Sequence, residues 1–541
     1  MIDRVPGTPV VVRLPRWGHA EWYRLGLWAA AAPVAALLVL PAAYLMIRAF
    51  DGGQTAWARM IHPGTLAAIG RTAWLALTVT AASAAVAVPL AWLTVRTDLP
   101  LRRFWAVLSP LPLVIPSYVS AFLFASLLGP RGLLQQFLEG FTGIERLPDL
   151  YGFPGAFLTL TLLTYPYVLL SVRGALQRMD RALEEASRSL GHGPLTTFRR
   201  VTLPHLRPAL GAGCLLVALY TLRDFGAVSI MRYGTLTRTI FVQYQTFDRS
   251  AAAALALLLT GLAFMILFFE ARTRGRASYY TDSPGGARPA AVVRLGPWRW
   301  PAFAFCAIVL AASLGLPSGV LIFWLVRGLR AGEALAPVAQ AAGNSLLGAA
   351  LAGITVVVAA LPIAGLTVRR SSPAARALER ISYSSFALPG LVVALALVFL
   401  GANYVPALYQ TLPLLILAYT ILFLPQAVGA VRASLLQVSP RLEEAARSLG
   451  RRPLQVFSTI TLPLLRPGIL TGAALVFLTA MIELPATLLL APIGFRTLST
   501  QVWSAASEAF FARAAAPALL MVLVSSVPMA FLLWRDRRRP A

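Results

Sequence analysis

Stretches of about 20 apolar residues recur along the whole chain, which is the length that a helix needs to cross the hydrocarbon core of a bilayer. Only 13% of the 541 residues are charged, whereas soluble domains carry roughly 25%. Inside lipid each backbone polar group must be paired within the chain, and continuous apolar runs achieve this as helices. We therefore expect an all-α polytopic membrane protein.

Hydropathy predicts about 12 transmembrane helices, six in each half of the chain. Their expected positions are near residues 25–47, 66–95, 104–128, 154–172, 208–224, 251–270, 301–326, 343–368, 382–402, 407–430, 467–490 and 513–534. The first run is too long for the core of a signal peptide, and no small-residue cleavage site follows it. We expect it to remain as the first span.

The basic residues are unevenly distributed between the two sides of the predicted membrane. All 47 are arginines. With the N-terminus inside, the inner segments hold 34 arginines and 12 acidic residues, and the outer segments and span ends hold 13 and 9. Because basic side chains stay on the cytoplasmic side, this asymmetry predicts an even number of spans with both termini in the cytoplasm. The arginines are scattered over short loops, which favours contact with membrane lipid and no nucleic-acid partner.

A polar, arginine-rich segment occurs twice in the chain. Residues 183–208 read LEEASRSLGHGPLTTFRRVTLPHLRP and residues 442–467 read LEEAARSLGRRPLQVFSTITLPLLRP, with 17 of 26 positions identical at an offset of 259. The repeat extends into the spans, where residues 88–96 match residues 361–369 at an offset of 273. The first half has extra residues in an outer loop near 129–153, which accounts for the change of offset.

The duplication divides the chain into two parallel six-helix repeats, related by an axis along the membrane normal. We expect a first unit over residues 1–270 and a second unit over residues 301–541. Residues 271–300 are rich in Arg, Gly, Pro and Ser, so this segment is predicted to be a cytoplasmic linker.

Each copy of the repeated segment has the pattern of two short helices joined by a turn. Leu183, Ala186 and Leu190 recur at helical spacing, which predicts an amphipathic first helix. Gly191 permits a sharp change of direction, and Pro194 suits the first turn of a second helix.

After these two helices, Pro204 and Pro208 are expected to break the path before the next span. A helix–turn–helix parallel to the membrane presents a compact surface that another protein can bind. The alternative is an amphipathic loop that only rests on the lipid surface. The presence of two such similar copies favours protein docking.

The motifs EEASRSLG and EEAARSLG, each followed by TLPxLRP, resemble the cytoplasmic EAA loops of ATP-binding-cassette (ABC) importer permeases. In that family the loop is the coupling helix, which docks into a groove of the ATPase subunit. The resemblance covers essentially the whole chain and implies two fused permease units. It implies that the ATPase-coupling residues are Glu184, Glu185, Ala186 and Gly191 in the first unit, and Glu443, Glu444, Ala445 and Gly450 in the second.

Energy conversion is expected on a different chain. A nucleotide-binding loop of the Walker type needs a lysine, and this sequence has none. The resemblance implies two copies of a cytoplasmic ABC ATPase, which carry ATP and Mg²⁺, and a periplasmic or lipid-anchored substrate-binding protein. We expect the chain itself to be a transport subunit, not an enzyme, without a cofactor of its own.

No stable metal site is predicted in the chain. Its four histidines fall on different loops, and Cys214 and Cys306 lie far apart within apolar spans.

Three stretches resemble the ferric iron branch of fused permeases: LRDFGAVSIMRYGTLTRTIF from Leu222, ALPGLVVALALVF from Ala387, and MIELPATLLLAPIGFRTLSTQVW from Met481. Ferric iron is therefore the expected substrate. Thiamine, a polyamine or a phosphonate moved by the same machinery stays open. An ion-coupled secondary transporter is an alternative from another class, although it would be expected to carry charges deep within several spans.

Two acids at equivalent positions, Asp224 and Glu483, are the candidates for the substrate path. Each lies 16 residues beyond the proline that starts its predicted span (Pro208 or Pro467), which corresponds to about 24 Å of helix. A carboxylate at that depth is costly unless it faces a cavity or has a partner. Two carboxylates across an axis would suit a hard cation in transit. The simpler interpretation is that each acid pairs locally or caps a helix end.

Overall fold

The computed structural model describes residues 18–51, 53–142, 148–179, 182–246, 248–273, 293–369 and 372–537. Within these ranges the secondary structure is helical, with one isolated β-bridge between Thr97 and Val293. Eleven helices are long and apolar enough to cross a membrane, or twelve if one sharply bent pair counts as a single span. The predicted all-α class with about twelve spans is confirmed. Residues 274–292 of the predicted linker lie outside the described residues.

The first half contains α1 (Gly18–Asp51), α2 (Gly53–Met60), α3 (Pro63–Arg96), α4 (Arg102–Leu108), α5 (Ser117–Leu128), α6 (Leu133–Thr142), α7 (Phe153–Arg178), α8 (Ala182–Ser189), α9 (Pro194–Thr197), α10 (Leu203–Arg223), α11 (Gly226–Ile230), α12 (Leu236–Gln245) and α13 (Arg249–Thr273). The second half contains α14 (Arg299–Leu310), α15 (Leu316–Arg330), α16 (Ala336–Arg369), α17 (Pro373–Ser384), α18 (Gly390–Asn403), α19 (Leu412–Leu435), α20 (Pro440–Ser448), α21 (Pro453–Val456), α22 (Leu462–Ile482), α23 (Pro485–Leu490), α24 (Leu498–Ser507) and α25 (Phe511–Arg537).

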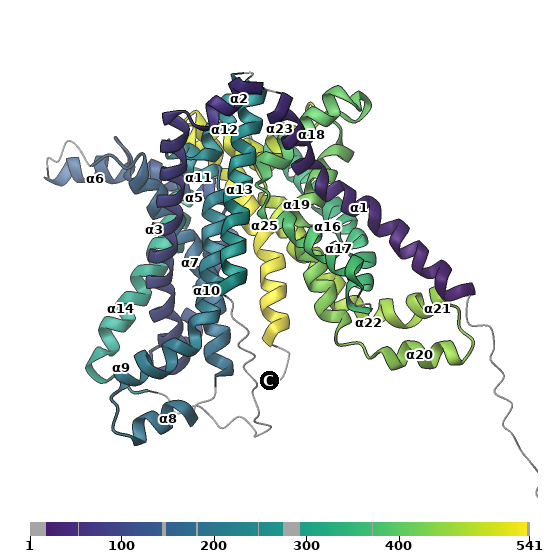
Figure 1. The fold of residues 1–541 in the computed structure, drawn as a ribbon. Helices are drawn as coiled ribbons and strands as arrows, with labels where there is room; N and C mark the ends of the chain where they lie inside the picture. Colours follow the sequence, from purple (N-terminus) through teal and green to yellow (C-terminus); the bar gives the residue numbers. More distant parts are fainter. Residues whose placement is uncertain are drawn as a thin grey trace, which may run out of the picture.

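Each half is built around three packed helices, α3, α7 and α10 in the first and α16, α19 and α22 in the second. The two groups diverge towards the end of the molecule that carries α8–α9 and α20–α21 (Figure 1). Gly213 allows α10 to approach α7 closely, and Gly472 allows α22 to approach α19 closely. An added Cβ would lie 2.7 Å from the Val168 Cα atom and 3.3 Å from the Ala427 Cα atom, respectively.

The first helix of each half reaches into the other half. α1 packs on α13 of its own half and also on α16, α17 and α18 of the second (Figure 1). In return, α14 packs against α3, and α15 packs against α5. The two halves are therefore interlocked through their first spans.

The third span of each half is broken, which corrects the prediction of continuous helices over 104–128 and 382–402. In the first half α4 ends at Leu108 and α5 begins after Pro116. In the second half the helices on either side of Pro389 are bent by 104°. A proline offers no backbone N–H and clashes with the preceding turn, so the helix restarts there in a new direction. Hydropathy alone does not detect such a change of direction.

Two further predictions about helix ends were wrong. Pro204 and Pro208 do not break the path, because helix continues from Pro194 through a π-helical turn, η2 (Phe198–Thr202), into α10. The π turn shifts the hydrogen bonding by one residue, so the proline in the first turn of α10 is tolerated. The predicted span 467–490 is also interrupted, because α22 ends at Ile482 and α23 begins at Pro485.

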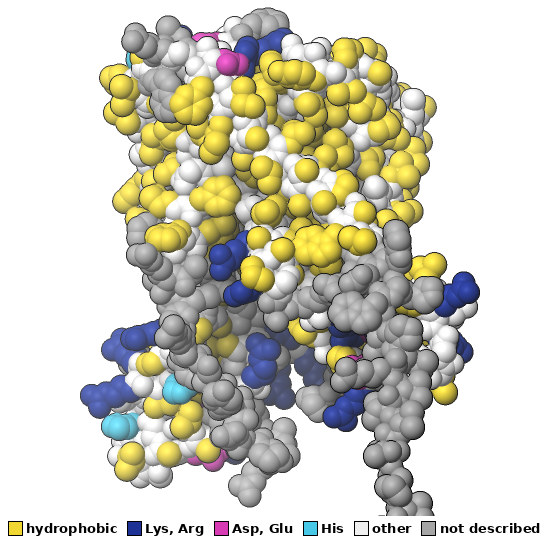
Figure 2. Space-filling model, turned by 45° about the vertical axis from the view of Figure 1, so that its right-hand side comes forward, with side chains coloured by type: hydrophobic (Ala, Val, Ile, Leu, Met, Phe, Trp, Pro, Cys, Tyr) yellow, Lys and Arg dark blue, Asp and Glu magenta, His cyan; other side chains and the backbone are white. Residues whose placement is uncertain are grey.

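The surface matches a protein that crosses a bilayer. Figure 2 shows apolar side chains covering the upper part of the molecule, with arginines gathered lower down. The coupling segments, α8–α9 and α20–α21, lie at this lower end (Figure 1). This separation agrees with the positive-inside pattern of the sequence.

Candidate translocation cavity and coupling segments

Asp224 and Glu483 lie where the fifth span of each half ends. The Asp224 Oδ2 atom accepts hydrogen bonds from the backbone N–H groups of Ala227 at 2.9 Å and Val228 at 3.2 Å. The Glu483 Oε1 atom accepts one from the N–H of Ala486 at 3.3 Å. Each acid therefore caps the short helix that follows it, α11 or α23, as the simpler interpretation of the sequence predicted.

The same two acids also line one cavity of about 220 Å³ between the halves. Around it stand three pairs of oxygen-bearing side chains at equivalent positions of the two halves. These pairs are Tyr167 with Gln426, Tyr220 with Thr479, and Asp224 with Glu483. Only the acidic pair was predicted from the sequence. The other two pairs combine different residue types, and only the 259-residue offset relates them.

Within each half, the residues contributed to the first two pairs contact each other. The rings of Tyr167 and Tyr220 lie 5.8 Å apart, and the Thr479 hydroxyl donates to the Gln426 Oε1 atom at 3.3 Å. Asp224 is only 7% exposed. Among the ion pairs of the described residues, none includes Asp224 or Glu483. Arg223, which also lines the cavity, interacts electrostatically with Glu483 over a longer distance. With two carboxylates and one guanidinium among the described lining residues, the site has an excess of oxygen acceptors.

Among the described residues, one arginine, Arg223, lines the cavity and joins the halves. The Arg223 Nη1 atom donates to the backbone oxygen of Phe386 at 2.9 Å, and the guanidinium lies 5.8 Å from the centre of that residue's ring. Its equivalent in the second half is the apolar Ile482. This cation is therefore engaged with the bent third span of the opposite half.

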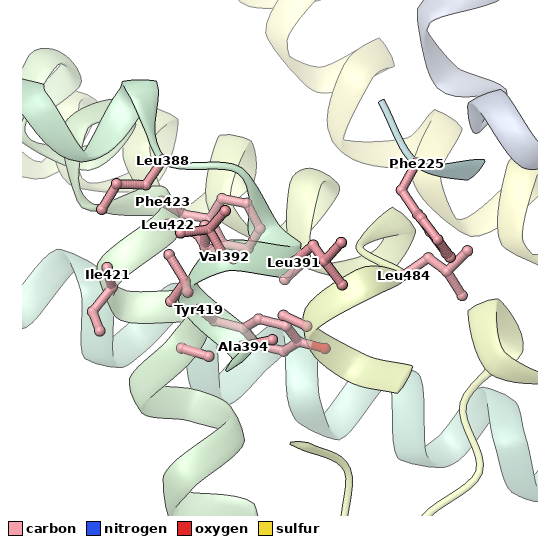
Figure 3. Close-up of a cluster of buried hydrophobic side chains, with 14 of the residues drawn as sticks. Phe225, Leu388, Leu391, Val392, Ala394, Tyr419, Ile421, Leu422, Phe423 and Leu484 are labelled. Carbon is pink, nitrogen blue, oxygen red and sulfur yellow. The ribbon is translucent and has the colours of Figure 1, made fainter. Parts of the chain in front are cut away.

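Apolar packing closes the cavity immediately after the acids. Phe225 and Leu484 follow Asp224 and Glu483, and both belong to one buried apolar cluster (Figure 3). The Phe225 ring lies 4.7 Å from that of Phe241 and 5.1 Å from that of Trp503. Phe241 belongs to α12, at the end of the molecule opposite the coupling segments (Figure 1). The cavity is thus sealed on that side.

The coupling segments have the predicted helix–turn–helix form. Gly191 and Gly450 end the first short helices with a φ of +83°, a conformation that favours glycine. Leu190 and Leu449, at 77% and 83% exposure, are nearly fully exposed. Such prominent leucines on a polar protein end indicate a surface that a partner covers.

The other predicted coupling residues divide into two groups. Glu185, Ala186, Glu444 and Ala445 are exposed on the same segments as the leucines. Glu184 is buried and Glu443 is half-buried, and both are turned towards the membrane helices.

Two segments of the chain, residues 85–274 and 356–539, match the family of binding-protein-dependent transport system inner membrane components. The chain is 37% identical to an Fe(3+)-transport system permease protein, FbpB 2, of Haemophilus influenzae, over 91% of this chain and 94% of that protein. It is 26% identical to the ferric transport system permease protein FbpB of Actinobacillus pleuropneumoniae, over 79% of this chain but 65% of that longer protein.

A shorter relative matches less than half of this chain. The sulfate transport system permease protein CysT of Salmonella typhimurium is 30% identical over 43% of this chain and 86% of its own length. The family match thus occurs once in each half, as the internal repeat predicts. The chain belongs to the ABC importer permeases, with two permease units joined in one polypeptide.

Proposed function

We propose that this permease moves ferric iron across the bacterial inner membrane into the cytoplasm. The observation that carries the proposal is the cavity between the halves, where both sides contribute oxygen-bearing side chains. Fe(III) is a hard cation that prefers oxygen ligands such as carboxylate and phenol groups over soft ones. Asp224, Glu483, Tyr167 and Tyr220 supply these groups in one place.

The same cavity argues against an oxyanion as the substrate. A dianion such as sulfate would meet the carboxylates of Asp224 and Glu483, which would repel it. Arg223, the one arginine among the described lining residues, is engaged with the backbone of Phe386. The iron-transporting relatives also match far more of the chain than CysT does.

The exposed faces of the two coupling segments are the proposed docking sites for an ATPase. Leu190 and Leu449 are the apolar centres of these faces, and Glu185 and Glu444 lie beside them. Two similar faces suit two copies of one cytoplasmic ATPase, which carries ATP and Mg²⁺. This arrangement requires both chain termini in the cytoplasm. A periplasmic or lipid-anchored binding protein delivers the substrate on the opposite side.

In the proposed cycle, closure of the ATPase dimer draws α8 and α20 together. The two halves then rock, and the seal around Phe225 and Leu484 separates towards the periplasm. The cavity accepts Fe(III) from the binding protein and releases it when the coupling segments move apart. The acids lower the cost of holding a trivalent cation between apolar walls.

The test removes both negative charges with Asp224→Asn and Glu483→Gln in the full chain, together with its ATPase and binding protein. We expect uptake of radioactive Fe(III) by vesicles to fall by about a hundredfold or more, because two charge contacts of 1.5–3 kcal/mol each are lost. Co-purification of the ATPase should be unchanged. Glu333→Gln, which removes an exposed carboxylate paired with Arg513, is the control and should transport normally. Full uptake by the double variant would refute the proposal.

A further inference from the structure

Beside the exposed coupling faces, each half contains a cluster of arginine, glutamate and threonine. In the first half the Thr202 hydroxyl donates to the Glu184 Oε1 atom at 2.9 Å, and the Arg96 Nη2 atom lies 3.8 Å from the same oxygen. Arg96 is only 3% exposed and Glu184 9%. A glutamate held in this way does not face the cytoplasm.

The second half repeats the cluster. The Arg369 Nη2 atom donates to the Glu443 Oε1 atom at 2.9 Å, and the Thr461 hydroxyl donates to the same oxygen at 3.2 Å. Arg447, one helical turn after the glutamate, approaches the other carboxylate oxygen at 3.7 Å. Two copies of one arrangement in a single chain show that it is a feature of the permease unit.

Each cluster joins three elements that are separate in the sequence. Arg96 and Arg369 are the last residues of α3 and α16, the second spans. The glutamates lie on the coupling helices α8 and α20. Thr202 and Thr461 end the π-helical turns η2 and η7 (Phe457–Thr461), which lead into the fifth spans. The coupling helix is thereby attached to both a second and a fifth span.

The neighbourhood of the clusters differs between the halves, whereas each cluster joins an arginine, a glutamate and a threonine at equivalent positions. Ser187 and Thr197, whose hydroxyls lie 3.1 Å apart, are replaced by Ala446 and Val456. The arginines are related by an offset of 273 and the glutamates and threonines by 259, so the same contact forms despite the extra residues between them. The side chains packed around the coupling helices differ between the halves, but in both halves the glutamate of the coupling helix contacts an arginine of the second span and a threonine before the fifth span.

We propose that Glu184 and Glu443 are positioning residues that transmit the movement of the coupling helices to the membrane spans, whereas Glu185 and Glu444 face the ATPase. A charged, directional contact resists sliding of the coupling helix along α3 or α16 in a way that apolar contacts do not. Movement of the ATPase is therefore passed directly to two spans in each half. This inference rests on the proposed docking of the ATPase.

The test uses Glu184→Gln with Glu443→Gln in the full chain, purified with its ATPase and binding protein and placed in liposomes. Three quantities are measured: the ATPase that co-purifies, the rate of ATP hydrolysis, and the Fe(III) taken up per ATP hydrolysed. We expect the first two to remain within about twofold and the third to fall about tenfold or more, because the contact between motor and spans is weakened. A residue that only supports folding would not change the ratio of uptake to hydrolysis.

Three companion variants make the result specific. Glu185→Gln with Glu444→Gln should instead reduce co-purification of the ATPase. In the first half, the charge swap of Arg96→Glu with Glu184→Arg should restore part of the uptake per ATP that either single variant loses. Because burial makes these charge variants prone to misfolding, Thr202→Val with Thr461→Val provides a mild version that should lower the ratio by a smaller amount.

Several outcomes would overturn the inference. One is unchanged uptake per ATP in the Glu184→Gln and Glu443→Gln protein or in the threonine variant. Another is loss of the ATPase from that glutamate variant but not from the Glu185→Gln and Glu444→Gln variant. Failure of the unaltered chain to bind an ATPase at all would instead refute the proposed function.

Discussion

The two halves of the permease share an acid at the cavity and an exposed leucine on each coupling segment, but they differ in the residues that pack beside these groups. At the cavity, both halves place an acid at the end of the fifth span. On the coupling segments, both expose a leucine before a glycine in the left-handed conformation. The supporting residues have diverged in volume and polarity, which shows where the duplicated units have had freedom to change.

Behind the acids, side-chain lengths compensate for one another. The shorter Asp224 lies near Ser117, whereas the longer Glu483 lies against Gly390, which occupies the equivalent position. An added Cβ at Gly390 would lie 2.4 Å from the Glu483 Oε1 atom. Glycine is therefore needed where the glutamate carries one more methylene group.

Behind the coupling segments, the two halves differ at one large side chain. In the first half Trp92 packs edge-on against Phe198, with ring centres 6.2 Å apart. The equivalent pair in the second half is Gly365 and Phe457, and both line a cavity of about 530 Å³. The absence of one large side chain thus leaves the second coupling segment above empty space.

The largest effect is expected at the cavity, from Gly390→Ala. The new Cβ would push the Glu483 carboxylate out of place, and overpacking of this kind costs about 1–3 kcal/mol, so we expect Fe(III) uptake to fall about tenfold. Adding Glu483→Asp should recover uptake, because the shorter acid fits beside a side chain as Asp224 does. Gly319→Ala, where an added Cβ meets open space away from the cavity, is the matched control and should change uptake less than about twofold. If Glu483→Asp does not recover uptake, the side-chain lengths are not coupled.

A smaller, structural effect is expected behind the coupling segments. Trp92→Ala should lower the free energy of unfolding by about 2 kcal/mol, roughly half the loss for a fully buried tryptophan, since Trp92 is only half-buried. Gly365→Trp should instead raise it by about 1 kcal/mol, because the space around Gly365 is open and new apolar area would be buried. Thermal unfolding of both variants in the same detergent measures the difference. A loss of stability in Gly365→Trp would mean that the hollow is not available for packing.

The smallest effect is expected where the fourth span meets the broken third span. In the first half Arg173 donates to the backbone oxygen of Ala106, and in the second the equivalent Arg432 pairs with the carboxylate of Glu379. Glu379→Ala gives the second half the residue of the first. Because this ion pair is partly exposed, we expect a stability loss of about 0.5 kcal/mol or less. A loss several times larger would show that the contact between the third and fourth spans depends on this ion pair in the second half but not in the first.

The sequence predicted the number of spans and the form of the coupling segments, because hydropathy and glycine–proline patterns report on local structure. It did not predict the breaks at Pro116 and Pro389, since hydropathy is similar on both sides of each bend. The continuous path past Pro204 was also missed. The π turn that makes it possible arises from packing and has no clear signature in residue types.

The predicted site residues show a similar limit. Helical spacing grouped Leu183 and Leu190 on one apolar face, but it did not indicate which way that face would turn, and in the structure both leucines are exposed while Glu184 is turned inward. An amphipathic helix usually turns its apolar face towards the protein. In α8 the leucines are exposed, and the buried Glu184 is paired with Arg96. The tyrosines of the cavity were missed because their equivalents in the second half are Gln426 and Thr479.

The crossing of α1 into the second half constrains the order in which the protein is made. α1 is complete at Asp51, but its contacts on α18 form only after Asn403 has been synthesised. At 5–20 residues per second the ribosome needs roughly 20–70 s to cover that interval. During this time the earliest span waits in the bilayer with part of its final contact surface facing lipid. Its packing is one of the last events of biogenesis.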